Sequence, residues 1–136
     1  MTKFESSIKE IPDSSELVYS KLADLNNLEA IKDKIPEEKA KDLTFDTDNV
    51  SVSVHPIGKI ALQIIEREPT KCIKFETTSS PAPFNLWIQL VPTSETSCKV
   101  KLTLGAQLNP FIKGMVQKPL QEGLEKIVEL LSKLPY

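Results

Sequence analysis

The sequence is poor in the residues from which many catalytic sites are built. Its 136 residues include one histidine (His55), two cysteines (Cys72 and Cys98) and four glycines. One histidine and two distant cysteines form no cluster with zinc-ligand spacing. The glycines are isolated, so the sequence has neither a phosphate-binding glycine loop nor a nucleophile elbow. These absences argue against the catalytic mechanisms that depend on such motifs. We therefore predict no metal, no cofactor and no catalytic residue.

The chain also lacks a basic excess and a long apolar run. Lys and Arg number 17 against 19 Asp and Glu, which argues against nucleic acid as a partner because few cations are free to displace counterions. No run approaches the roughly 20 apolar residues of a membrane helix, so we expect no integral membrane association. Residues 1–5 contain no apolar signal stretch. We therefore expect a cytoplasmic protein with free thiols.

What is present has the composition of one soluble domain. Hydrophobic residues make up 40% of the chain and charged residues 26%. A chain of this length buries roughly 68% of the surface that its unfolded form exposes, which is enough for a core. No linker or internal repeat divides the sequence, so we expect a single domain over residues 1–136.

The first part of the chain predicts one strand and two short helices. Residues 3–11 alternate between apolar and polar side chains, as in a half-buried strand. Asp13 and Glu16 have the spacing of a helix cap with reciprocal side-chain bonding. Apolar residues at helical spacing then predict helices over 14–24 and 27–35.

The middle of the chain predicts a series of strands with short connections. A short strand is expected around Leu43 and Phe45. Five further segments alternate apolar and polar residues: 50–55, 60–65, 72–76, 86–91 and 99–108. Such spacing is typical of antiparallel hairpins with one wet face and one dry face.

The end of the chain predicts a long amphipathic helix. Asn109 is a good N-cap, and Pro110 suits the first helical position. Pro119 lies inside the helix and predicts a kink there. One apolar stripe runs along the helix and comprises Phe111, Met115, Leu120, Leu124, Ile127, Leu131 and Leu134.

This order of elements predicts an α+β domain. A curved antiparallel sheet of about six to seven strands has one apolar face, which needs a cover. The C-terminal helix, at roughly 37 Å, is long enough to cross that face. We therefore predict a helix-grip fold, in which the sheet wraps around the long C-terminal helix and two short helices follow the first strand.

The chain resembles a known superfamily over essentially its whole length. The resemblance rests on Phe4-Glu5-Ser6, Leu22 to Leu28, Ile64 to Pro69, Pro83 to Leu90, and Asn109-Pro110-Phe111 through Met115 to Glu125. These segments resemble the SRPBCC superfamily, which includes START lipid-transfer domains and polyketide cyclase-like proteins, and in particular its small Bacteroides-type bacterial members. The resemblance implies a cavity for an apolar small molecule between the sheet and the long helix. It implies no catalytic residue, because the superfamily has no universal catalytic motif.

Alternation and helix phase predict which side chains face each other across the interior. The predicted cavity lining is Leu62, Ile64, Phe75, Leu86, Ile88, Leu102 and Leu104 from the sheet, and Met115, Val116, Leu120 and Leu124 from the helix. One interpretation is an open apolar ligand site. The other is a filled core made of the same residues. The chain is short for this architecture, which favours a small or collapsed cavity.

Two residues are candidates for the cavity mouth. Glu66 is in phase with Leu62 and Ile64, so we expect it to point inward near a strand end, where a carboxylate can anchor a ligand or act as a general base. The alternative is a solvated strand end beside a lysine. Phe84 follows the most loop-like segment and is expected to gate the mouth or to tuck onto the core.

Other singled-out residues are expected outside the cavity. Trp87 is out of phase with the apolar series, so it marks either a protein contact on the outer face or simple coverage of the sheet. His55 is expected on the surface. Cys72 and Cys98 have opposite phase, which makes a disulfide between them geometrically poor.

Three functions are consistent with the sequence. The first is a non-enzymatic binding protein for a hydrophobic or amphipathic small molecule. The second is a protein-interaction or regulatory module with a vestigial cavity, in one version a homodimer that uses Trp87. The third is a cyclase- or hydratase-type enzyme that uses Glu66.

Overall fold

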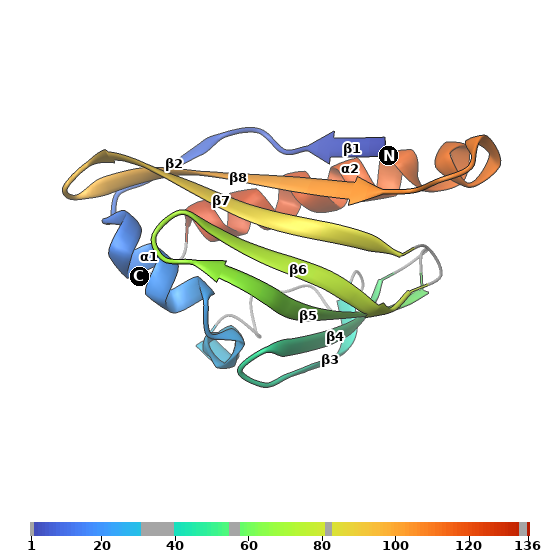
Figure 1. Ribbon diagram of the computed structural model, residues 1–136, viewed down its shortest axis with the longest axis horizontal. Coiled ribbons are helices and arrows are strands. Elements are labelled where there is room, and N and C mark those ends of the chain that lie inside the picture. Colours follow the sequence, from blue (N-terminus) through green and yellow to red (C-terminus); the bar gives the residue numbers. More distant parts are fainter. Residues whose placement is uncertain (1, 31–39, 55–57, 81–82, 134–135) are drawn as a thin grey trace.

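A computed structural model describes residues 2–30, 40–54, 58–80, 83–133 and 136 (Figure 1). It confirms the predicted architecture of an antiparallel sheet with a short helix after the first strands and a long C-terminal helix. The elements in chain order are β1 (Thr2–Glu5), β2 (Lys9–Ile11), α1 (Ser15–Leu22), the 3-10 helix η1 (Leu25–Ala30), β3 (Ala40–Phe45), β4 (Asn49–Val54), β5 (Gly58–Glu68), β6 (Cys72–Ser79), β7 (Phe84–Ser94), β8 (Ser97–Ala106) and α2 (Pro110–Ser132).

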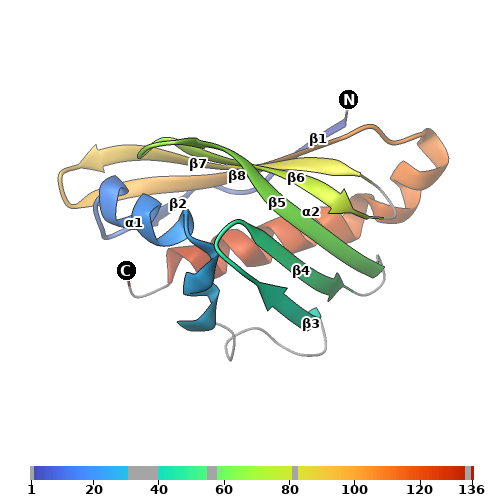
Figure 2. The same ribbon diagram turned by 60° about the horizontal axis from the view of Figure 1, so that its bottom comes forward.

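The sheet is continuous from one edge to the other. Its strand order is β1-β8-β7-β6-β5-β4-β3, and β2 pairs with β8 beyond the end of β1. Each of these pairings is antiparallel. Figure 2 shows the sheet curling from β7 and β8 down to β3 and β4, with α2 on its concave side. The C-terminal helix α2 therefore covers the face of the sheet that would otherwise be exposed.

The concave face carries the core. Phe4, Leu104, Leu86, Phe75 and Ile64 form one row across five strands, each directly opposite the next. Residues that are directly opposite in a ladder share a face of the sheet. All five side chains are buried, so this row defines the inner face of the sheet.

The strand predicted over 3–11 is two strands, β1 and β2. Between them the chain holds one residue more than the segment of β8 with which it pairs. Ser6 fills the break, because its backbone N donates to Leu102 O and its Oγ accepts from Leu102 N, both at 2.9 Å. An extra residue reverses the alternation of side chains. Ile8, which strict alternation over 3–11 would place on the face of Phe4, is therefore 61% exposed.

The short helices differ from their predicted bounds. The N-cap of α1 is Ser14, whose Oγ accepts from Leu17 N at 3.2 Å, and not Asp13. The predicted helix over 27–35 overlaps η1, a 3-10 helix that begins at Leu25. The rest of that prediction lies outside the described residues, as does the prediction for His55.

The start of α2 is as predicted. Asn109 is its N-cap, with Oδ1 accepting from Ile112 N at 2.8 Å, and proline occupies the first turn. Pro119 lies inside the helix. Proline has no N–H, so the carbonyl of Met115 lacks its usual intrahelical donor. The kink expected at this point stays a prediction.

Candidate ligand-binding site

The helix α2 packs on the concave face of the sheet through one strip of apolar side chains. Leu120, Leu124, Val128 and Leu131 are buried. The strands that α2 approaches most closely are β8, β2 and β1. The helix is thus seated over one side of the sheet and not over its centre.

One flank of α2 is hydrogen-bonded to that nearby edge. Gln121 Nε2 donates to the carbonyl of Glu5 at 2.8 Å. Glu125 accepts from the backbone N and from the hydroxyl of Ser7, each at 2.7 Å. These bonds fix both the position and the rotation of the helix, because they join one flank to the strand edge at two successive turns.

The opposite flank of α2, formed by Val116, Gly123 and Ile127, faces the other half of the sheet. At 3.6 residues per turn these residues lie on the side of the buried strip away from Gln121 and Glu125. Val116 is half-buried and packs at the margin of the core, whereas Ile127 is 44% exposed. A Cβ placed on Gly123 would meet no atom within 4 Å. We call these three residues the open flank.

A second apolar surface faces the open flank from the sheet. Val50 and Val52 on β4, Leu62 on β5 and Thr77 on β6 share the inner face, because Val50 pairs with Leu62 and Leu62 pairs with Thr77. All four are only half-buried, unlike the inner residues of β7 and β8. The seating of α2 over β8, β2 and β1 explains the difference. We call these four residues the far wall.

The end of the sheet beside α1 is held by the single arginine of the chain. Arg67 donates from Nε and Nη2 to the carbonyl of Ala23, at 3.0 and 2.9 Å, and forms a salt bridge with Asp48. Ala23 is the C-cap of α1, and Asp48 lies in the turn between β3 and β4. In the same cluster Leu25 N donates to Thr47 O at 3.1 Å. Arg67 therefore ties α1 to the far edge of the sheet.

Of the eleven predicted lining residues, only two lie on the open flank and the far wall. Leu62 and Val116 are half-buried and belong to the far wall and the open flank. Eight others are buried in the core: Ile64, Phe75, Leu86, Ile88, Leu102, Leu104, Leu120 and Leu124.

The prediction that Met115 faces the sheet is wrong. Its side chain is 64% exposed. Met115 and Leu120 are five residues apart, which turns one from the other by roughly 140° around a helix with 3.6 residues per turn. The apolar stripe read from the sequence therefore joins two different faces of α2.

The prediction that Glu66 lies at a cavity mouth is also wrong. The register of β5 shifts between Ile64 and Glu66, so that Glu66 pairs with Lys74. Lys74 lies between two buried residues of β6 and points to the outer face, and Glu66 is exposed on that face. A bulge thus reverses the phase on which the prediction depended.

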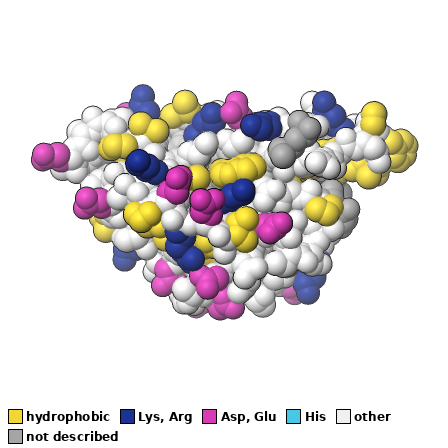
Figure 3. Space-filling model, viewed as in Figure 1, with side chains coloured by type: hydrophobic (Ala, Val, Ile, Leu, Met, Phe, Trp, Pro, Cys, Tyr) yellow, Lys and Arg dark blue, Asp and Glu magenta, His cyan; other side chains and the backbone are white. Residues whose placement is uncertain are grey.

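Phe84 and Trp87 occupy different faces of β7. Phe84 is buried in the core cluster, and its backbone N donates to Thr77 Oγ1 at 3.1 Å. Trp87 is half-buried on the outer face, where Lys74 Nζ lies 5.4 Å from the ring centroid, within cation–π range. Figure 3 shows charges of both signs mixed with apolar side chains over this face. The role of Trp87 in a protein contact stays a prediction.

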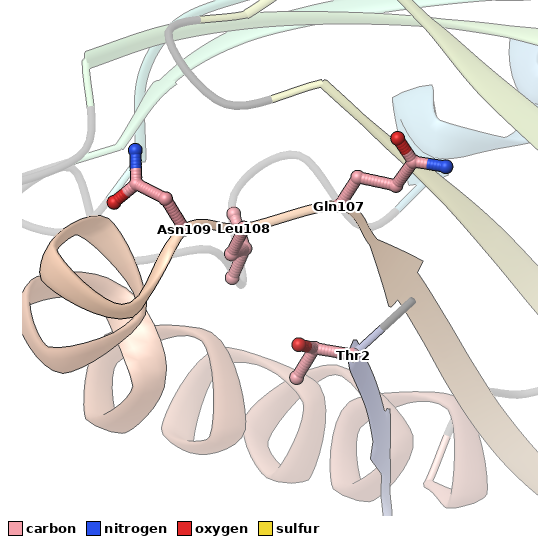
Figure 4. A pocket seen from close by; sticks show the side chains of 4 residues that line it. All are labelled: Thr2, Gln107, Leu108 and Asn109. Carbon is pink, nitrogen blue, oxygen red and sulfur yellow. The ribbon is translucent and has the colours of Figure 1, made fainter.

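A different hollow lies where β8 passes into α2. It is an open depression of about 400 Å³ lined by Thr2, Gln107, Leu108 and Asn109 (Figure 4). Three of the four lining side chains are polar, and the Asn109 carbonyl oxygen already caps α2. This hollow is therefore separate from the apolar surfaces described above.

The described residues offer little polar chemistry near the open flank. Among them, no three His, Cys, Asp or Glu side chains lie close enough to share a metal ion. Within the same residues, every buried side-chain N or O atom has a hydrogen-bond partner. Burial raises the pKa of both Cys72 and Cys98, which are free thiols and poor nucleophiles in that state. An apolar ligand suits this site better than a reacting polar one.

Sequence reasoning missed Val50, Val52, Gly123 and Ile127 as members of the site. Only Gly123 carries a usable signal, because a glycine inside a helix costs about 1 kcal/mol relative to alanine and so needs a reason. The half-burial of the others depends on where α2 is seated, which no local pattern specifies.

Comparison with known proteins supports the fold. No protein-family model matches the sequence, and no curated protein matches it. Norcoclaurine synthase from Thalictrum flavum, in complex with dopamine and hydroxybenzaldehyde, is similar with a TM-score of 0.75 and 16% identity over 97% of this chain and 84% of that chain. A START superfamily protein from Mycobacterium smegmatis has a TM-score of 0.61 and 15% identity over 95% of this chain and 98% of that chain.

These similarities confirm the resemblance drawn from the sequence at the level of the fold. The chain has a helix-grip fold, similar to that of norcoclaurine synthase and of the START superfamily protein. A Bacillus thuringiensis protein has the same arrangement, with a TM-score of 0.61 and 12% identity over 96% of this chain and 98% of that chain. None of the helices in the described parts of the chain is long and apolar enough to span a membrane.

Proposed function

We propose that this protein binds a hydrophobic or amphipathic small molecule between the open flank of α2 and the far wall of the sheet. The observation that carries the proposal is that two apolar surfaces face each other and neither is fully buried. In a filled core, inward side chains such as Val52 and Leu62 would be covered as completely as Ile64, which is 6% exposed.

The composition of the two surfaces indicates the class of ligand. The open flank and the far wall contain no charged side chain and one hydroxyl, that of Thr77, which already accepts a hydrogen bond from Phe84 N. Sites of this kind gain affinity from burying apolar area, at about 25 cal/mol per Å². An aliphatic or aromatic body with few polar groups fits that chemistry.

The comparisons supply a second support. The norcoclaurine synthase structure contains dopamine and hydroxybenzaldehyde, both small aromatic molecules. A similar arrangement of sheet and helix in this chain is consistent with a small organic ligand. Binding is proposed and not catalysis, because Glu66, the carboxylate considered for an enzyme, lies on the outer face. The two free cysteines support the further proposal of a cytoplasmic location.

The proposal is tested by ligand-induced stabilisation. The purified chain is first examined by native mass spectrometry for a co-purified molecule. Thermal unfolding is then followed with fatty acids, sterols and small aromatic amines and aldehydes. A ligand at about 100 times its Kd stabilises by roughly 2.7 kcal/mol, which for this length raises Tm by roughly 9 °C. A chain that co-purifies with nothing and that none of these ligands stabilises contradicts the proposal.

A further inference from the structure

The first turns of α2 form an apolar projection at one end of the molecule. Phe111 is 78% exposed and Met115 is 64% exposed, the two largest exposed fractions among the large hydrophobic side chains described. They are four residues apart and therefore lie on one face of the helix. Figure 1 shows these turns extending past the end of the sheet, and in Figure 3 apolar side chains gather at the same end. We call Phe111 and Met115 the apolar tip.

The other exposed large hydrophobics do not form such a pair. Ile8 lies between β1 and β2, Leu17 on α1, Ile65 on β5, Val91 on β7 and Ile127 on the open flank of α2. Single exposed apolar residues are normal on a protein surface, whereas a cluster marks a contact site. The tip is also on a different face of α2 from the open flank, so it does not belong to the proposed ligand site.

The charges nearest the tip along the chain are positive. Residues 107–121 include Lys113 and Lys118 and no Asp or Glu, although the chain as a whole has a formal charge of -2. Lys118 follows Met115 by three residues and shares its face of the helix, whereas Lys113 lies on the opposite face. The first acidic residue on the face of the tip is Glu122, one turn beyond Lys118. Both lysines are exposed, and no ion pair of either is found within the described residues. An acidic chain thus carries a local cationic and apolar surface.

We propose that the apolar tip docks on a membrane surface that carries anionic lipid. Phe111 and Met115 would enter the boundary between headgroups and acyl chains, and Lys118, on the same face of the helix, would face lipid phosphates. Anionic membranes attract juxtaposed lysines and would repel the rest of this acidic chain, so the charge pattern also sets the orientation of the protein. The proposal does not depend on the ligand site, because the tip and the open flank are different faces of α2.

The test is sedimentation of the full chain with vesicles of phosphatidylcholine alone or mixed with phosphatidylglycerol at about two to one. We expect binding to the mixed vesicles, weakened by added salt because exposed charges are screened. Lys118→Gln should reduce the affinity by about fivefold, and Lys113→Gln, on the opposite face of the helix, should reduce it less. The double variant Phe111→Ser/Met115→Ser should lose about tenfold or more.

The matched control is Ile8→Ser/Val91→Ser, which removes two apolar side chains elsewhere that are 61% and 60% exposed, and it should leave binding unchanged. Circular dichroism of each variant establishes that it is folded. Absence of binding to the mixed vesicles, equal binding to phosphatidylcholine alone, or equal loss in the control variant overturns the proposal. A concentration-dependent dimer that Phe111→Ser/Met115→Ser abolishes, with no vesicle binding, overturns it in favour of self-association. Ligand-induced stabilisation is a separate measurement, so failure of one proposal is distinguishable from failure of the other.

Discussion

The carboxylate of Glu125 accepts two hydrogen bonds from Ser7, one from the backbone N–H and one from the hydroxyl, each 2.7 Å long. The two residues are 118 positions apart in the chain. Their contact joins the last helix to the break between the first two strands. Because it fixes the rotation of α2, it also determines that the open flank faces the far wall.

Glu125→Gln should destabilise the protein in a pH-dependent way. The hydrogen bonds from the hydroxyl and then the backbone of Ser7 hold the pKa of Glu125 below its ordinary value. A carboxyl with a lowered folded pKa stabilises the protein above its unfolded pKa, and that contribution is lost as pH falls through the folded value. We expect a loss of about 1 kcal/mol at neutral pH and a smaller loss near about pH 3.

Urea unfolding of the native chain and the variant at both pH values measures this difference. Glu122→Gln is the control, because Glu122 is exposed on the same helix. A Glu125→Gln effect that is the same at both pH values, or no larger than that of Glu122→Gln, would show that the charged contact is unimportant.

Arg67→Lys should loosen the end of the sheet beside α1. Lysine cannot reproduce the two nitrogen contacts of Arg67 to the carbonyl of Ala23 while it pairs with Asp48. The guanidinium is partly exposed, so we expect a cost of only about 1 kcal/mol. Hydrogen exchange should become faster over 22–30 and over the β3–β4 turn. Lys71→Ala is the control, and equal exchange in the two variants would contradict the assigned role.

Trp87→Ala distinguishes a structural residue from an interface residue. Trp87 is half-buried and stacked with Lys74, so the substitution should lower the free energy of unfolding by about 1 to 2 kcal/mol. We expect the mass measured by light scattering to be that of a monomer before and after the change. A dimer that dissociates in the variant would instead support the homodimer considered from the sequence.

The sequence predicts the positions of the helices and strands better than it predicts which side of each is buried. Alternation alone identifies β4 to β8, and Asn109 with Pro110 marks the start of α2, because these signals depend on a few neighbouring residues. Apolar periodicity also carries the helix correctly through Pro119, although proline has a low helix propensity.

The errors share one physical cause, which is a change of phase. A bulge after Ile64 turns Glu66 outward, and an extra residue before Lys9 turns Ile8 outward. In α2, Met115 and Leu120 are five residues apart and therefore lie on different faces of the helix. Each of these shifts depends on pairing with a distant strand or on where the helix packs. The residue pattern of one strand or one helix therefore cannot predict it.

Gly123 and Gly114 provide the most direct test of the central claim, that the space beside the open flank is the ligand site. Both are helical glycines beside which an added Cβ meets nothing within 4 Å, but only Gly123 lies on the open flank. Leucine at either position gains about 0.8 kcal/mol of helix propensity. With a ligand found by thermal shift, isothermal titration should show affinity lost by about tenfold or more in Gly123→Leu and unchanged in Gly114→Leu. Equal affinity in the two variants would contradict the account.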